Sequence, residues 1–408
     1  MTQEFKHLLI GARFALLEVH PSNRFFLVLW LVGPFFLLIE RTPADVWLSF
    51  LALSFVVKTI NTRDFQFLNF FWVRAIFLFW CICLISAGLS KVPLYALGET
   101  FSWIRFPLFA MASVFWLGKD RRLVNMMLLS LATAFLIMCC ILLTEIIVEG
   151  FKQRLSWPYG DLVPGNFLAK AGMPVITSAT ALAVSEKGNK QHFAMAFISI
   201  GIVFVVLTGE RINSLTLIFG VFVSAVFLSN DRIKLFKLLS LTLVLFTGML
   251  FFQPGLYERY ITSFFAQLPF NSQSSYYDTM ATAVFAFTQD PIFGVGTASL
   301  RVLCADLINL KPSIECNNHP HNYYLQLLGE TGILGFVTGV AFIVAITYAC
   351  VYGWKHWPKS SARKVAWVTP FVLFWPLAST ADFFGQWNNI FLWSAIALAL
   401  SITHHKND

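Results

Sequence analysis

The sequence predicts an all-α, polytopic membrane protein with about twelve transmembrane helices. Hydrophobic residues make up 57% of its 408 residues and charged residues only 12%, whereas soluble domains carry roughly a quarter charged residues. This composition excludes a water-soluble fold. Apolar runs recur along the chain, most of them near the ~20 residues that cross the hydrocarbon core of a bilayer. The predicted spans are 25–39, 43–57, 67–89, 100–117, 123–148, 164–185, 192–208, 212–229, 236–252, 330–353, 365–380 and 386–402.

The first twenty residues are expected to form an amphipathic helix at the membrane surface. Apolar Phe5, Leu8 and Phe14 are interspersed with Lys6 and Arg13. The stretch lacks the small-residue cleavage site of a removed signal peptide.

The distribution of Lys and Arg predicts the orientation of the chain, because cytoplasmic loops retain positive charge. Most of the 29 Lys and Arg residues fall on one side of the predicted spans, together with both termini. That side is predicted to be cytoplasmic. The net charge of +8 mainly reflects this topology and does not indicate a nucleic-acid surface. The minority on the outside are Arg41, Lys91, Lys152, Arg154, Lys170, Arg211, Arg259, Arg301 and Lys311.

Two outside segments, 149–170 and 253–330, are longer than the short connections expected between packed helices. The second is long enough for surface helices, for example at 257–268 and 274–289, and for one running through His321 into the tenth span. Long ordered loops are usually functional. The chain therefore divides into helices one to nine (1–252), a large outside loop (253–330) and helices ten to twelve (331–408).

His319 and His321 are the histidines predicted to face outside, while the other six lie on the cytoplasmic side or at the termini. Pro320 is expected to fix the start of a helix on which His321 shares a face with Leu325 and Leu328. An imidazole of near-neutral pKa held at the membrane surface can act as a general base towards a hydroxyl. A solvated, idle histidine is the alternative. Glycines that let a neighbouring backbone approach closely follow at intervals of three, at Gly329, Gly332 and Gly335.

Zinc ligation is the competing use of these two histidines. Histidines at i and i+2 do not share a helix face, and no nearby CxxC or HExxH supplies further ligands. The sequence also lacks an Asp-x-Asp pair in its first outside loop and any phosphate-binding glycine loop. We therefore expect chemistry without a metal, ATP or another cofactor.

Arg211 stands at the mouth of the predicted eighth helix, where a cation costs free energy unless it is paired or reaches water. Glu210 could be its partner. Alternatively, the guanidinium could bind phosphate oxygens in a bidentate way. Asp382, between the last two spans, is either a possible partner for an outside arginine or a solvated cap. Further anion-binding candidates are Arg154, Lys170, Arg259 and Arg301.

Cys304 and Cys316 lie in the large outside loop, where an oxidising compartment would allow a disulfide between them. The other cysteines lie in apolar helices and are interpreted as small core residues. They are Cys81, Cys83, Cys139, Cys140 and Cys350.

Taken together, these motifs resemble those of the bacterial O-antigen ligase and O-antigen polymerase superfamily. His321-Asn322, nine residues, and then Gly332-x-x-Gly335 is similar to its H[NSQ]-x9-G-x-x-G pattern. Segment 290–296, DPIFGVG, is similar to the D-P-x-x-G-x-G lead-in to the family histidine. Arg211, preceded by Thr-Gly-Glu, resembles the family arginine at the start of a mid-chain helix.

The resemblance implies a GT-C-like glycosyltransferase of the bacterial inner membrane with a periplasmic active site. The implied donor is a glycan on undecaprenyl diphosphate, in contact with membrane lipids, and transfer inverts the anomeric carbon. His321 is implied as the base or acceptor-orienting group, and Arg211 as the first diphosphate-binding arginine. Arg259 is our substitute for the second, because Ser274-Ser275-Tyr276-Tyr277 stands where members often carry one. Candidate supporting residues are Asn322, His319, Arg154, Arg301, Glu210 and Asp382.

The acceptor distinguishes the functions that the resemblance allows. A ligase uses lipid A–core oligosaccharide, and a polymerase uses another lipid-linked repeat. The length near 400 and the single large loop favour the ligase, since polymerases often carry two comparable loops. Protein O-oligosaccharyltransferases of the same superfamily usually extend further at the C-terminus, whereas this sequence ends at Asp408. A twelve-helix transporter is the alternative of another class, but the sequence shows no internal repeat and few buried charges, Arg74 and Arg105.

Overall fold

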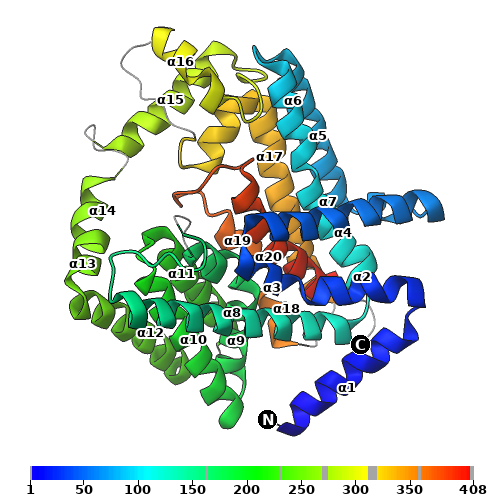
Figure 1. The fold of residues 1–408 in the computed structure, drawn as a ribbon, viewed down its shortest axis with the longest axis vertical. Coiled ribbons are helices and arrows are strands. Elements are labelled where there is room, and N and C mark those ends of the chain that lie inside the picture. Colours follow the sequence, from blue (N-terminus) through cyan, green and yellow to red (C-terminus); the bar gives the residue numbers. More distant parts are fainter. Residues whose placement is uncertain are drawn as a thin grey trace.

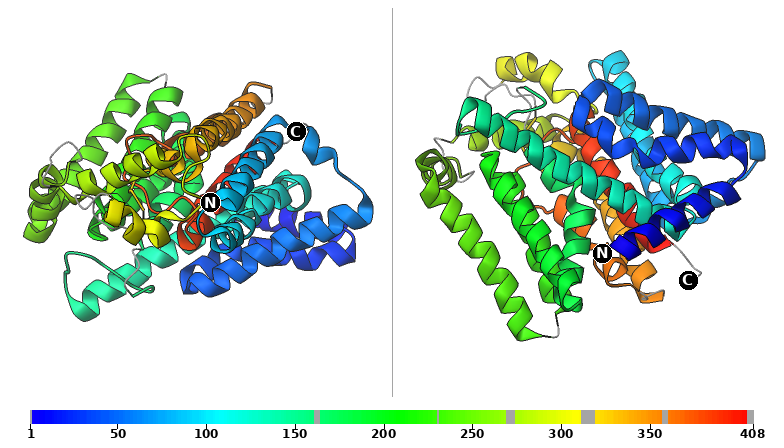
Figure 2. Two further views of the ribbon diagram at one scale, coloured as in Figure 1. Left: turned by 90° about the horizontal axis from the view of Figure 1, so that it is seen from above. Right: turned by 60° about the horizontal axis from the view of Figure 1, so that its bottom comes forward.

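The computed structural model describes residues 2–160, 164–229, 231–268, 274–310, 319–356 and 360–404. All regular secondary structure in these ranges is helical, from α1 (Thr2–Glu18) to α20 (Gln386–His404) (Figure 1). The long helix α17 (Tyr323–His356) and α20 lie in the middle of the molecule. Figure 2 shows them between the early helices, in blue and cyan, and the green helices that follow α8. The predicted all-α class is confirmed.

Within the described ranges, eight helical segments are long and apolar enough to cross a membrane. A ninth candidate is the pair α2 (Pro21–Leu31) and α3 (Gly33–Ile39), which is bent by 42°. One of the eight, Pro93–Leu117, joins α6 (Pro93–Trp103), α7 (Arg105–Ala112) and η2 (Ser113–Leu117). The other seven are α4 (Arg41–Thr62), α5 (Phe71–Leu89), α8 (Arg121–Glu149), α10 (Asn189–Leu207), α11 (Arg211–Leu228), α12 (Arg232–Phe252) and α17.

The remaining three predicted spans fall on shorter or more polar helices. Segment 164–185 contains η3 (Phe167–Ala171) and α9 (Met173–Ser185), and segment 365–380 follows α18 (Ser361–Val365) and contains α19 (Val368–Leu373). The third, α20, has 19 residues and is buried along almost its whole length. A helix buried on all sides belongs to the core of a bundle. The count of twelve spans is therefore not confirmed.

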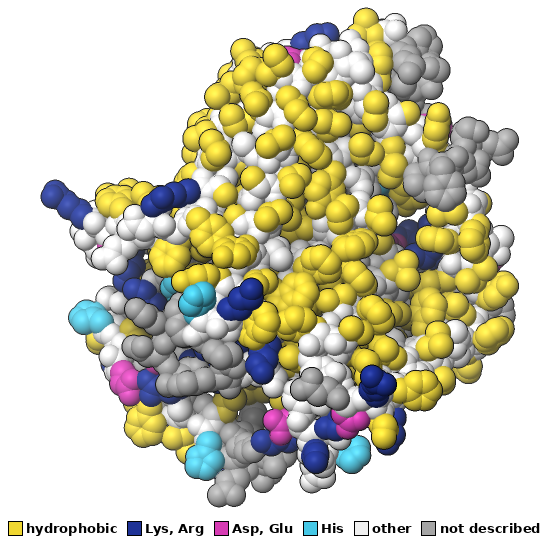
Figure 3. Space-filling view, turned by 180° about the vertical axis from the view of Figure 1, so that it is seen from behind, with side chains coloured by type: hydrophobic (Ala, Val, Ile, Leu, Met, Phe, Trp, Pro, Cys, Tyr) yellow, Lys and Arg dark blue, Asp and Glu magenta, His cyan; other side chains and the backbone are white. Residues whose placement is uncertain are grey.

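The surface is strongly apolar, as a membrane protein requires. Leu53, Leu89 and Phe252 are more than 60% exposed although they lie on candidate spans. Figure 3 shows hydrophobic side chains across most of one face, with many of the charged groups gathered towards its lower edge. An apolar surface of this extent needs lipid to cover it. The chain is thus a multi-pass membrane protein.

The described residues between α12 and α17 form five helices: α13 (Pro254–Tyr257), η4 (Glu258–Thr262), α14 (Ser263–Ala266), α15 (Ser275–Gln289) and α16 (Leu300–Leu310). The helices predicted near 257–268 and 274–289 are confirmed, whereas α16 was not predicted. Cys304 of α16 is disulfide-bonded, and its predicted partner Cys316 lies outside the described residues.

The remaining cysteines and the N-terminal helix also allow comparison with the predictions. Cys83, Cys139 and Cys350 are buried and free, as predicted, but Cys81 and Cys140 lie exposed on α5 and α8. A period of 3.6 residues turns these two to the outer face of their helices. The predicted N-terminal helix is present as α1.

The predicted helix through His321 is wrong. His321 has a left-handed backbone conformation, with φ 53°, and α17 begins two residues later at Tyr323. The side chain of Asn322 accepts hydrogen bonds from the backbone N–H groups of Tyr324 (3.0 Å) and Leu325 (3.1 Å). Asn322 is therefore the N-cap, and the capping bonds place His321 just outside the helix.

Helix α17 is broken at Gly332, where φ is 63° and ψ is −168°. The break frees backbone groups that segment 290–296 satisfies. The N–H of Ile333 donates to the carbonyl of Pro291 (2.9 Å), and the N–H of Val295 donates to the carbonyl of Gly329 (3.1 Å). The DPIFGVG segment and the Gly332-x-x-Gly335 segment, which are 36 residues apart or more, thus form one interlocked unit.

The glycines of this unit are required by close backbone contacts. A Cβ atom at Gly332 would lie 2.3 Å from the carbonyl oxygen of Ile292, and one at Gly294 would lie 2.4 Å from the carbonyl carbon of Glu330. A Cβ at Gly329 would approach the carbonyl oxygen of Ala283 in α15 to 2.8 Å. The expected close approach of a neighbouring backbone is confirmed for Gly329 and Gly332, whereas a Cβ at Gly335 would meet the side chain of Thr331.

We expect Gly332→Ala to destabilise the protein by roughly 1–3 kcal/mol, because alanine is strained at positive φ and its Cβ meets the segment at 291–293. Thermal unfolding in detergent would show this as a lower Tm. Gly88→Ala in α5 is the matched control, since nothing lies within 4 Å of a Cβ there. An unchanged Tm in the Gly332 variant would contradict the interlock.

Candidate functional site

The histidine segment is fixed between the start of α17 and the segment that leads into α20. The carbonyl of His321 accepts a hydrogen bond from the N–H of Thr380 (2.8 Å). The side-chain amide of Asn322 donates to the carbonyl of Pro376 (2.8 Å). The ring of His319 lies 4.3 Å from that of His321, centroid to centroid. Tertiary contacts therefore hold both imidazoles in place.

Burial keeps both histidines neutral. It lowers the pKa of His319 to about 3, and nearby His321, Arg301 and Lys170 lower it further. Burial also lowers the pKa of His321 below its ordinary value. In the described part of the chain, Nε2 of His319 is buried without a hydrogen-bond partner. At neutral pH His321 is thus an uncharged imidazole that can accept a proton.

Tyr276 of α15 connects the histidines with the arginines. Its ring lies 5.0 Å from that of His321 in an edge-on arrangement. Burial lowers the pKa of Arg154, nearby Arg259 and Arg211 lower it further, and Tyr276 opposes the change. The three arginines and Tyr276 therefore share one electrostatic environment, and His321 lies at its edge.

Glu210, the N-cap residue of α11, lies at the centre of the arginine cluster. Its carboxylate forms an ion pair with Arg154 and lies 3.5 Å from Nη2 of Arg259. Nε of Arg259 donates to the carbonyl of Gly209. Glu210 thus neutralises part of the charge of Arg154 and Arg259, although the sequence suggested Arg211 as its partner.

Arg211 is the first residue of α11 and is only partly exposed. Its Nη2 donates to the side-chain oxygen of Gln267. Its Nη1 is buried and has no hydrogen-bond partner among the residues that the structure describes. A buried guanidinium N–H without an acceptor is unfavourable, so this group is available for an anionic ligand.

The segment that carries Arg154 is held against the start of α11. The carboxylate of Glu145, buried in α8, accepts hydrogen bonds from the N–H groups of Ser156 and Trp157, both at 2.9 Å. Gly209, with φ 70°, leaves room for the carbonyl of Gln153, which would lie 2.0 Å from a Cβ at that position. The positions of Arg154 and Glu210 thus depend on each other.

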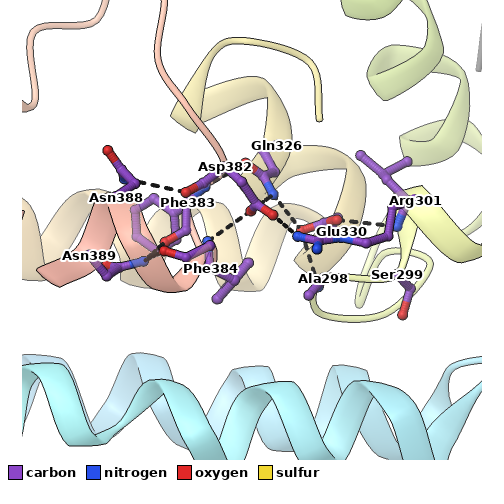
Figure 4. Close-up of polar contacts among 12 residues, drawn as sticks. Ala298, Ser299, Arg301, Gln326, Glu330, Asp382, Phe383, Phe384, Asn388 and Asn389 are labelled. Atoms are coloured by element: carbon purple, nitrogen blue, oxygen red, sulfur yellow. Dashed lines mark hydrogen bonds and ion pairs between the residues drawn. The ribbon is translucent and has the colours of Figure 1, made fainter. Parts of the chain in front are cut away.

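A second polar network includes Arg301, Asp382, Gln326 and Glu330 (Figure 4). Arg301 of α16 forms an ion pair with Asp382, which is 8% exposed. Asp382 also accepts a hydrogen bond from Gln326 (2.7 Å). The buried carboxylate of Glu330 accepts hydrogen bonds from Gln326 (3.1 Å) and from the N–H of Leu300 (3.2 Å) at the start of α16. Asp382 is therefore the partner of an outside arginine, and its alternative interpretation as a solvated cap is wrong.

Lys170 approaches the same region from η3. Its ammonium group donates to the side-chain oxygen of Asn388 in α20 (2.6 Å), and Asn388 donates to the hydroxyl of Tyr323 (2.7 Å). The structure thus brings Arg154, Arg211 and Arg259 together near Tyr276, while Arg301 and Lys170 lie near His319.

Sequence reasoning missed the contact of Tyr276 with His321 and the network of Gln326 and Glu330. A signal existed for Tyr276, because it stands just before the lead-in, where family members often carry an arginine. Glu330 was a carboxylate at the apolar start of a predicted span, and such a group needs buried donors. Within the described ranges, no group of three or more His, Cys, Asp and Glu side chains could hold a metal ion. The metal-free chemistry stays a prediction.

The fold and this site define a class: an all-helical, multi-pass membrane protein with buried neutral histidines beside clustered arginines. The family model described as O-antigen ligase matches residues 194–340. This match includes Arg211, Arg259, Tyr276, His321 and Gly332, and it confirms the resemblance seen in the motifs. Residues 194–340 are therefore similar to the O-antigen ligase domain that this family model describes. No curated protein matches the chain.

Proposed function

We propose that the protein is an O-antigen ligase that transfers a glycan from undecaprenyl diphosphate to lipid A–core oligosaccharide. One observation carries the proposal: Tyr276 lies 5.0 Å from the ring of His321 and close enough to Arg154 and Arg211 to interact with them, and Tyr276, His321 and Arg211 all lie inside the segment that matches the family. A base for a hydroxyl and cations for a diphosphate are the two needs of this reaction. In this proposal His321 is the base, and the nearby arginines are the cations.

In the proposed reaction, the acceptor hydroxyl loses its proton to the imidazole of His321. The hydroxyl oxygen forms a bond to the anomeric carbon of the donor sugar while the bond from that carbon to the diphosphate oxygen breaks. Attack from the face opposite the leaving group inverts the anomeric carbon. The electron pair of the broken bond leaves with the diphosphate. His321 could also act by orienting the hydroxyl.

Arginines stabilise the leaving diphosphate in this proposal. Nη1 of Arg211 is free for a phosphate oxygen, and Arg259 is retained as the second diphosphate-binding group. Glu210 lowers the repulsion between the guanidinium groups of Arg154 and Arg259. Charge-assisted hydrogen bonds of this type favour a leaving group that gains negative charge. We propose supporting roles for Arg154, Arg301, His319, Asn322 and Asp382, and no metal or other cofactor.

We further propose a GT-C-like arrangement of twelve spans with both termini cytoplasmic and the site periplasmic in the inner membrane. The three further spans at 164–185, 365–380 and 386–402 complete that count. An O-antigen polymerase would use the same site with a second lipid-linked repeat as acceptor, and this is the alternative function. Polar residues that sit at helix ends and not along a midplane path make a transporter the less suitable class.

The acceptor experiment tests the proposed function. Purified protein receives lipid-linked glycan with either lipid A–core or additional lipid-linked repeats, and the ligase should form product only with lipid A–core. Product only with extra repeats would show a polymerase.

We expect His321→Ala to reduce turnover about 10²- to 10⁴-fold, as loss of a general base does. His192→Ala is the matched control, because His192 is exposed and lies on the opposite predicted side of the membrane. Wild-type turnover in the His321→Ala variant would remove His321 from the mechanism.

The pH profile tests the protonation state of His321. Only the neutral imidazole accepts a proton, so kcat/KM should fall as the pH drops through the pKa of His321. Because burial lowers this pKa, the midpoint of the fall should lie below about 6.5. Initial rates measured between about pH 5 and pH 8 would give the midpoint. A midpoint above about 7 would contradict a buried neutral base.

Arg211→Lys tests the diphosphate contact. Lysine keeps the charge but loses the planar pair of N–H donors, so kcat/KM for the donor should fall about tenfold or more. Arg232→Lys is the matched control, because Arg232 is likewise the first residue of a membrane helix, α12, and lies on the other predicted side. Equal donor kinetics in wild type and the Arg211 variant would leave Arg211 a structural role only, through Gln267.

A further inference from the structure

A pocket of about 200 Å³ lies where the ends of four helical elements meet, away from the site described above. Its lining comes from the last two turns of α4, the connection through η1 (Gln66–Asn69) that leads to α5, the end of η2 with the loop after it, and the end of α20. Lys58, Lys119 and His404 contribute polar groups, and Phe70, Phe115 and Trp116 contribute aromatic walls. The excess of Lys and Arg predicts that this side of the protein is cytoplasmic.

The pocket carries net positive charge. Lys58 and Lys119 are close enough to interact electrostatically. The ammonium group of Lys58 lies 5.1 Å from the centre of the Trp116 ring. Asp64 is the single carboxylate of the lining, and no ion pair joins either lysine to an acidic group in the described part of the chain. Two lysines beside one carboxylate leave an excess charge for an anion.

The rim of the pocket is apolar and exposed. The short helix η1 (Gln66–Asn69) connects α4 with α5. Phe65, just before η1, is 48% exposed, and Leu68 on η1 is 38% exposed. Ile60 on α4 and Phe71 on α5 are exposed as well. Cations with apolar side chains beside them, at the ends of membrane helices, match the boundary between lipid headgroups and acyl chains.

We propose that this pocket binds one anionic phospholipid of the cytoplasmic leaflet. Lys58 and Lys119 contact the headgroup phosphate, Trp116 lies beside the glycerol region, and the acyl chains pass over the exposed side chains of η1, α4 and α5. A free phosphate ion would use the lysines but not the apolar rim. The bound lipid connects the turn between α4 and α5 with the end of α20, the central helix of the bundle.

Lipid binding can be measured by native mass spectrometry of the full chain with phosphatidylglycerol. The double variant K58Q/K119Q should bind about 10- to 30-fold more weakly, since each lysine near an anionic lipid adds a favourable contribution. The matched control K187Q/K237Q removes two exposed lysines from the same predicted side and should bind as wild type does. Phosphatidylcholine should bind wild type and the double variant equally.

Two further measurements keep the proposal falsifiable if the double variant folds poorly. K58R/K119R keeps both charges and should retain phosphatidylglycerol, and phosphatidylglycerol should raise the Tm of wild type more than millimolar inorganic phosphate does. Equal loss of binding in K187Q/K237Q would show a general charge effect and overturn the site. Equal stabilisation by inorganic phosphate would show an ion site without a lipid. Donor transfer should be unchanged in K58Q/K119Q, because these lysines lie outside the proposed catalytic groups.

Discussion

The backbone interlock between segment 290–296 and the break in α17 at Gly332 is the constraint on which the rest of the site depends. The break exposes N–H and carbonyl groups in a region with little water, where unpaired backbone groups cost several kcal/mol. Segment 290–296 satisfies them, and its position fixes the start of α16. The carboxylate of Glu330 completes this start by accepting from the N–H groups of Ala298 and Leu300. Arg301 then follows on α16 at the histidine segment.

Burial gives the charges around this unit their chemical character. Burial lowers the pKa of both histidines, and nearby Arg301 and Lys170 lower that of His319 further. Glu210 and Asp382 form ion pairs with Arg154 and Arg301. A neutral base close to fixed positive charge suits proton uptake from a hydroxyl next to a departing anion. Several charged groups of the site stand at or next to helix ends, as Glu210, Arg211 and Arg301 do, whereas Glu330 is buried within α17 beside its break.

The sequence predicted elements well where one physical signal dominated. Long apolar runs located eight spans and the bent ninth, and the intervals of three between glycines predicted a close backbone approach. It failed at His321, because a Pro-His-Asn run is compatible with a helix start at any of these residues. Only the capping bonds of Asn322 decide that the helix begins at Tyr323. It also missed α16, whose start is fixed by Glu330, 30 residues away from Leu300.

By itself the sequence determined that this is an apolar, all-helical membrane protein with a histidine motif and arginines on one predicted side. Composition and spacing carry that information because lipid imposes apolar runs of fixed length. The tertiary structure decided which residues meet: Tyr276 with His321, Glu210 with Arg154 and Arg259, and Asp382 with Arg301. These partners lie 45 to 81 positions apart in the sequence, with Glu210 separated from Arg259 by 49 positions and from Arg154 by 56. No local pattern encodes such pairs, because the packing of separate helices sets them.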